Sequence, residues 1–163
     1  MKQSLEEIIK SPFAKERFRL AQEAFEHTMS VIKGSSNRLS ESEIQTSFGQ
    51  KIITSLNKMR EEKIEEPLYS LEWIQHVAFL AEAYGVGNCC EKGCVTFNVL
   101  HRLLDLLPSG RGINIELFNN PMIDHFFVVI GRDSSTDSAN PCTWNKEAII
   151  CDPWVGKTLL FSW

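Results

Sequence analysis

Hydrophobic positions in the first half of the chain recur at helical spacing. In residues 11–33 the apolar side chains are separated by steps of three and four, which places them on one face of a helix. They are Phe18, Ala21, Phe25, Met29 and Ile32. A shorter amphipathic segment, residues 4–10, comes before them. The pattern predicts helices whose apolar face belongs to the core.

Two more helices are predicted before residue 85. Ser40 and Glu43 have the spacing of a capping box, so a second helix should begin there. Its predicted apolar stripe is Ile44, Phe48, Ile52, Leu56 and Met59. A third helix should cover residues 70–85 and end near Gly85, a residue suited to the left-handed end of a helix. Its predicted apolar stripe is Leu71, Ile74, Ala78 and Ala81.

The pattern changes after residue 88. Residues 89–107 predict one apolar helix, and four short segments with strand-forming composition follow it. These segments are residues 113–118, 125–131, 147–152 and 158–163. The second of them is apolar over five consecutive positions, which indicates a strand covered on both faces. We therefore expect an α+β fold, with a helical subregion at 1–84 and a helix plus an antiparallel sheet at 85–163.

Composition narrows the class of protein. With 163 residues, of which 43% are hydrophobic, the chain 1–163 is long enough for one domain with its own core. The net charge is -4, and basic residues are interspersed with acidic ones, which argues against a nucleic-acid partner. No apolar run near the N-terminus resembles a Sec signal peptide or a membrane span.

The cysteines indicate where the protein resides. There are five, an odd number, and three of them lie close together in residues 89–94, unlike the spaced frameworks of secreted domains. This pattern favours a reducing compartment. We expect a cytoplasmic protein, or one delivered into a host cell by a specialised secretion system.

The segment around Cys89 contains the chemistry of greatest interest. Asn88 is a good N-cap for the helix, and Glu91 stands at the capping-box position three residues later. Cys89 then takes the first helical position, where the helix dipole and unpaired N–H groups favour a thiolate. The same N–H groups suit the oxyanion that forms when a thiolate attacks an acyl carbon. Cys89 is the predicted nucleophile.

A nucleophilic thiol needs a base, and His125 is the best of the four histidines. It begins the strongest predicted strand, whereas His27 and His76 are expected on helix surfaces. His101 lies about 18 Å from Cys89 along the same helix, too far to share its proton. Asp152, at the end of another strand, is the predicted orienter because alternation allows it to face His125.

Other aspartate and cysteine residues could take these roles. Asp124 is a weaker orienter because it should point away from His125 across the strand, and Cys90 is the competing nucleophile. The remaining cysteines are expected to be core packing; they are Cys94, Cys142 and Cys151. A zinc site using Cys90 and Cys94 would need a second ligand pair that the spacing does not offer. The sequence therefore predicts no metal and no cofactor.

Three segments together resemble a known family. "GNCCEKG" is similar to the nucleophile segment of transglutaminase-like cysteine enzymes among bacterial effector proteins. "DHFFVVIG" and "AIICDPW" resemble the His and Asp segments that accompany it. The resemblance covers about residues 85–155 and assigns Cys89 as nucleophile, His125 as base and Asp152 as orienter. Asn88, Cys90 and Glu91 are its surrounding motif positions.

The resemblance implies a papain-like, transglutaminase-like core in which a cysteine helix packs on an antiparallel sheet. It also implies a virulence-associated acyl-transfer enzyme acting on a protein, such as a host protein. Deamidation, transamidation and proteolysis all fit. NlpC-type hydrolases and arylamine N-acetyltransferases share the order Cys, His, Asp. The motif departs from its usual form at Cys90, Lys92 and Gly93. A non-catalytic binding module or inactive enzyme-like effector remains the alternative.

Overall fold

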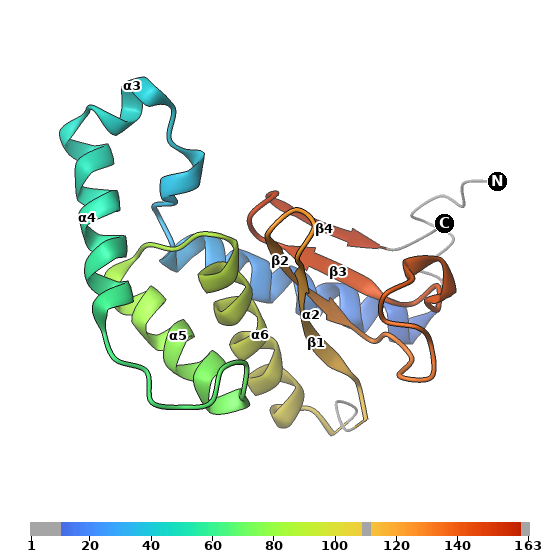
Figure 1. Cartoon of the computed structure of the whole chain (residues 1–163). Coiled ribbons are helices and arrows are strands. Elements are labelled where there is room, and N and C mark those ends of the chain that lie inside the picture. The colour runs from blue at the N-terminus through green and yellow to red at the C-terminus, as the bar shows by residue number, and fades with distance from the viewer. Residues whose placement is uncertain (1–10, 109–111, 161–163) are drawn as a thin grey trace.

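The computed structural model describes residues 11–108 and 112–160 (Figure 1). Its helices are α2 (Pro12–Val31), α3 (Glu41–Ile44), α4 (Ser47–Glu61), α5 (Leu71–Tyr84) and α6 (Cys89–Leu106), with 3₁₀ turns η1 (Ser36–Arg38) and η3 (Pro141–Thr143). Its strands are β1 (Ile115–Asn120), β2 (His125–Ile130), β3 (Ile149–Asp152) and β4 (Lys157–Leu160). The predicted α+β class is confirmed. The predicted helix at 4–10 and strand positions 161–163 lie outside the described residues.

The strands form an antiparallel meander in the order β1-β2-β3-β4. Asn120 pairs with His125 beside the β1–β2 turn, and Val128 pairs with Cys151. Continuing that register places Asp152 beside Phe127, two residues from His125 and on the same face of the sheet. Strand β2 is buried at four of its six positions, as its apolar sequence predicts.

Helix α6 lies between α5 and the sheet, and α2 crosses the same helix and packs on β3 (Figure 1). The approach of α6 to the sheet is close at Gly93, where an added Cβ would stand 2.9 Å from a methyl group of Leu117. One buried cluster joins α2, α6 and strands β2 and β3. Its members are Leu20, Ala21, Ala24, Leu100, Leu104, Val128, Ile130, Ile149 and Cys151. Side chains from both ends of the chain therefore share one core.

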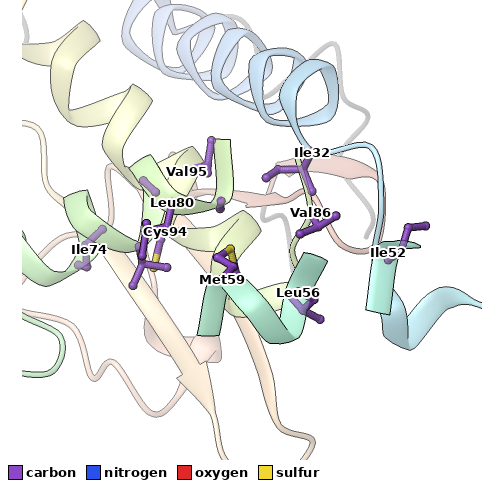
Figure 2. Close-up of a cluster of buried hydrophobic side chains, with 12 residues drawn as sticks. Ile32, Ile52, Leu56, Met59, Ile74, Leu80, Val86, Cys94 and Val95 are labelled. Carbon is purple, nitrogen blue, oxygen red and sulfur yellow. The ribbon is translucent and has the colours of Figure 1, made fainter. Parts of the chain in front are cut away.

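A second cluster holds the helices together on the other side of α6. Side chains from α4, α5 and α6 converge there, as Figure 2 shows for Leu56, Met59, Ile74, Leu80 and Cys94. The predicted third helix is confirmed, including its end at Gly85, which has a left-handed φ of 68°. The capping box of Ser40 and Glu43 is also present.

The predicted second helix is in fact two helices. Helix α3 ends at Ile44, and α4 begins at Ser47, with the Thr46 hydroxyl accepting from the backbone N–H of Gly49 at 3.0 Å. The predicted apolar stripe of α4 is confirmed at Ile52, Leu56 and Met59, which are buried, and it differs at the start of the helix. Gly49 is buried against the backbone of Glu43, whereas Phe48, predicted to be core, is 61% exposed.

Helix α2 also buries a face slightly different from the predicted one. Its buried residues are Ala14, Leu20, Ala21, Ala24 and Thr28. Phe18 and Phe25 lie partly buried at the edge of the cluster. Small side chains on the inward face let α2 approach α6 closely, since the Thr28 hydroxyl lies 2.8 Å from that of Thr96.

Within the described residues, none of the helices combines the length and the apolar character that crossing a membrane requires.

Candidate active site

The start of α6 is held by a buried carboxylate. Glu91 accepts a hydrogen bond from the backbone N–H of Asn88 at 2.8 Å, as a capping box requires, and pairs with Arg60 of α4 at 2.7 Å. The Asn88 side-chain amide donates to the Ser36 hydroxyl at 3.1 Å. The predicted N-cap and its Glu91 partner are therefore in place, and both tie the helix start to other segments.

The loop before the helix is held by residues 34–35. Gly87 N–H donates to the Gly34 carbonyl at 2.9 Å, and the Ser35 hydroxyl donates to the Gly87 carbonyl at 2.6 Å. A side chain at Gly87 does not fit, because an added Cβ would lie 2.7 Å from the Cβ of Glu91. These contacts determine where the first residue of α6 stands.

His125 and Asp152 meet as alternation predicts. His125 Nε2 lies 2.7 Å from Asp152 Oδ2, and the two side chains are only 13% and 10% exposed. The other carboxylate oxygen, Oδ1, accepts the backbone N–H groups of Trp154 at 3.1 Å and Val155 at 3.0 Å. Asp152 is thus oriented by its own turn, and it holds the imidazole of His125 in one position.

Cys89 occupies the first position of α6, as predicted. Its thiol, which is partly exposed, donates to the carbonyl of Asp124 at 3.7 Å. That carbonyl belongs to the peptide bond leading into His125. Although both residues are described, no hydrogen bond joins the Cys89 thiol to the His125 imidazole. The structure brings His125 and Asp152 into contact, and it places the Cys89 sulfur against the backbone of the two residues that flank His125.

The surroundings of Cys89 favour a protonated thiol at rest. Burial raises the pKa of Cys89 above its ordinary value. The backbone N–H groups of Phe126 and Cys90 lower this pKa, and they are outweighed. This differs from the expectation that the helix start alone favours the thiolate. Because the thiol is protonated at rest, attack by Cys89 would require a base.

Trp154 is a site residue that the sequence analysis gave no role. Its indole meets the His125 ring edge-on, with ring centroids 5.3 Å apart. The indole N–H donates to Asn37 at 3.0 Å, and the guanidinium of Arg38 lies 5.0 Å above the ring. Trp154 therefore shields the His125–Asp152 pair and connects it to η1. The only signal in the sequence was its place two residues after Asp152.

Phe126 links the thiol to an open pocket. The pocket has a volume of about 430 Å³ and lies between Tyr69, α5, α6 and strand β1, with Phe126 in its wall. Tyr69 adopts a left-handed φ of 65°, and its ring lies 6.2 Å from that of Phe126. The pocket is mostly apolar, so it offers space for an apolar group beside Phe126.

The other cysteines have different environments. Cys90 packs partly buried against the cluster of α4 and α5, while Cys94 and Cys151 are buried as predicted. Cys142 is exposed on η3, so its predicted core role is wrong. It follows a proline in a turn whose Asn140 side chain accepts its backbone N–H, which leaves the thiol outward.

The remaining predicted alternatives lie away from the His125–Asp152 pair. His27, His76 and His101 pair with acidic residues at the surface of helices. Asp124 has an exposed side chain and a left-handed φ of 45°, and it is Asp152 that bonds to His125. In the part of the chain that the structure describes, no three His, Cys, Asp or Glu side chains are grouped to hold a metal ion.

No protein-family model, curated protein or solved structure gives a significant match to the chain. Any statement about function therefore depends on the residues and geometry described above.

Proposed function

We propose that this protein is a cysteine-dependent acyl-transfer enzyme with Cys89 as nucleophile, His125 as base and Asp152 as orienter. The observation that carries the proposal is the bond between His125 Nε2 and Asp152 Oδ2, next to a cysteine at a helix start. Nucleophilic catalysis by a thiol needs a nearby imidazole as base, and a carboxylate that holds this imidazole in position.

The hydrogen bonds define which imidazole nitrogen is the base. Because the Asp152 carboxylate accepts from Nε2–H, Nδ1 carries the free lone pair. For proton transfer, the Cys89 sulfur has to leave the Asp124 carbonyl and approach this nitrogen. Nδ1 takes the thiol proton as the sulfur attacks, which suits a thiol whose pKa is raised by burial.

The reaction proceeds through a thioester. The sulfur of Cys89 bonds to the carbon of a carboxamide or amide, and the C–N bond breaks as His125 returns its proton to the leaving nitrogen. Backbone N–H groups near the sulfur, those of Phe126 and Cys90, are candidate donors to the oxyanion. Water then releases an acid, as in deamidation or proteolysis, whereas an amine gives transamidation.

The resemblance to transglutaminase-like effectors supports the same proposal. In a papain-like core a cysteine helix packs on an antiparallel sheet, and here α6 contacts β1 and β2 of such a sheet. We therefore propose a transglutaminase-like architecture and a protein substrate, with host-cell proteins as the first candidates to test.

The test compares wild type with Cys89→Ala on candidate proteins. Products are identified by mass spectrometry, because deamidation, cleavage and cross-linking change substrate mass differently. We expect one of these products with wild type and none with Cys89→Ala. Cys142→Ala is the matched control, since it removes an exposed thiol far along the chain and should keep full activity.

A binding module would behave differently. The biological effect of the protein would then survive Cys89→Ala and His125→Ala, with the fold of both variants verified by circular dichroism. That result would reject the enzyme proposal.

A further inference from the structure

Lys92 is a buried lysine without an ion-pair partner. Its exposed fraction is 3%, although lysine is almost never buried unless it is paired. Glu91, Arg132 and Asp152 are also buried, and each has an opposite or ionisable partner within salt-bridge distance. Among the described residues, Lys92 has neither an ion pair nor a hydrogen bond from its ammonium group. It therefore occupies a site that is unfavourable for its charge.

The position of Lys92 is next to the candidate nucleophile. It stands three residues after Cys89 in α6, so the two side chains lie on the same face of the helix, one turn apart. Asp152 of β3 and Arg38 of η1 also act on it electrostatically. Lys92 thus lies within the electric field of Cys89 and of the residue that orients His125.

The charges around Lys92 have opposite effects. Burial lowers the pKa of Lys92, and the positive charge of Arg38 lowers it further. Asp152 and Cys89 raise it, because their negative forms favour the ammonium. Attraction between an ammonium and a thiolate is mutual, so a charged Lys92 one turn along the helix favours the negative form of Cys89.

We propose that Lys92 is a positioning residue whose ammonium stabilises the negative charge that develops on Cys89 when the thiol loses its proton. The inference rests on the proposed role of Cys89 as nucleophile. Backbone N–H groups alone do not offset the burial of the sulfur, and Lys92 adds a positive charge one turn along the same helix. The usual apolar residue at this motif position would not do so.

The test is the pH dependence of Cys89 alkylation by iodoacetamide. Fragment-ion mass spectrometry separates Cys89 from Cys90. Lys92→Met keeps the length of the side chain and removes its charge, and we expect it to raise the apparent pKa of Cys89 by about one unit. At a fixed pH below both pKa values, alkylation should then be about ten-fold slower. Lys63→Met is the matched control, because Lys63 is exposed and pairs with Glu65.

Each outcome is decisive. An unchanged Cys89 pKa in Lys92→Met would overturn the proposal, as would an equal shift in Lys63→Met. Lys92→Gln gives the same comparison if the methionine variant fails to fold. His125→Ala in the same assay addresses the proposed function separately. Suppose that His125→Ala leaves alkylation and product formation unchanged, while Lys92→Met shifts the pKa of Cys89. The proposed triad would then be wrong, and the effect of Lys92 on Cys89 would stand.

Discussion

On the proposed triad, replacing Asp152 by Asn should abolish activity while leaving the fold intact. In the structure Oδ1 accepts two backbone N–H groups, from Trp154 and Val155, and Oδ2 accepts from His125. An asparagine has only one oxygen, so it must either face the two N–H groups or face the histidine. The two orientations have very different energies.

The backbone N–H groups should decide the orientation. Turning the NH₂ group toward them would leave two partly buried donors unsatisfied, at about 1–3 kcal/mol each. The oxygen therefore stays with Trp154 and Val155, and the NH₂ of residue 152 points at His125 Nε2. Because a donor now faces Nε2, the imidazole must carry its proton on Nδ1 and loses the lone pair that the Cys89 thiol needs.

The expected loss of kcat is on the order of 10⁴-fold, the size seen when a triad carboxylate is replaced and the imidazole takes the wrong tautomer. Thermal stability should fall by only about 1–2 kcal/mol, since a charge-assisted bond is lost and the turn is kept. Nitrogen-detected NMR reports the tautomer directly. Asp133→Asn is the matched control, because Asp133 also caps a turn through a backbone N–H, that of Ser135. Near-normal kcat in Asp152→Asn, or an Nε2–H tautomer, would refute the reasoning.

Three further outcomes can be measured on the folded protein. Gly49→Ala should lower Tm, because the new Cβ would collide with the carbonyl of Glu43, and this outweighs the better helix propensity of alanine. A higher Tm would contradict the packing of α3 on α4. Arg60→Ala should lower the free energy of unfolding by about 1–3 kcal/mol, because it leaves the buried carboxylate of Glu91 without its cation. Chemical denaturation measures this, and an unchanged midpoint would show that the pair does not stabilise the fold. The pKa of the Cys89 thiol is raised in the folded protein, so above about pH 8.5 the thiol ionises more readily in the unfolded chain. Wild type should therefore lose stability relative to Cys89→Ala as the pH rises beyond this value. Parallel curves of Tm against pH for the two proteins would contradict this.

Much of the candidate site follows from local rules that the sequence contains. The capping pattern of Asn88 and Glu91 predicted where α6 begins and therefore placed Cys89 at its first position. Strand alternation predicted that His125 and Asp152 share a face, and the sheet register brings them into contact. These features depend on a few neighbouring residues, which is why a single sequence can specify them.

Features that depend on distant segments could not be predicted in the same way. Phe48 belongs to the same apolar stripe as the buried Ile52 and Leu56, but it stands in the first turn of α4, after the break from α3, and is exposed. The second cap at Thr46 was a signal for that break. Cys142 is exposed on the short turn η3, whereas the charged Lys92 is buried in α6. Burial of this kind is a property of tertiary neighbours.

The contacts of residues 34–37 make the candidate site sensitive to the helical half of the chain. Gly34 and Ser35 hold the loop at Gly87, and Asn37 holds the indole of Trp154 over His125. A single displacement of this short segment would loosen the loop before Cys89 and uncover the imidazole of His125 at the same time. It would do so without changing any residue of the proposed triad. The proposed acyl-transfer activity should therefore be absent from either half expressed alone and return only when the two fragments reassemble.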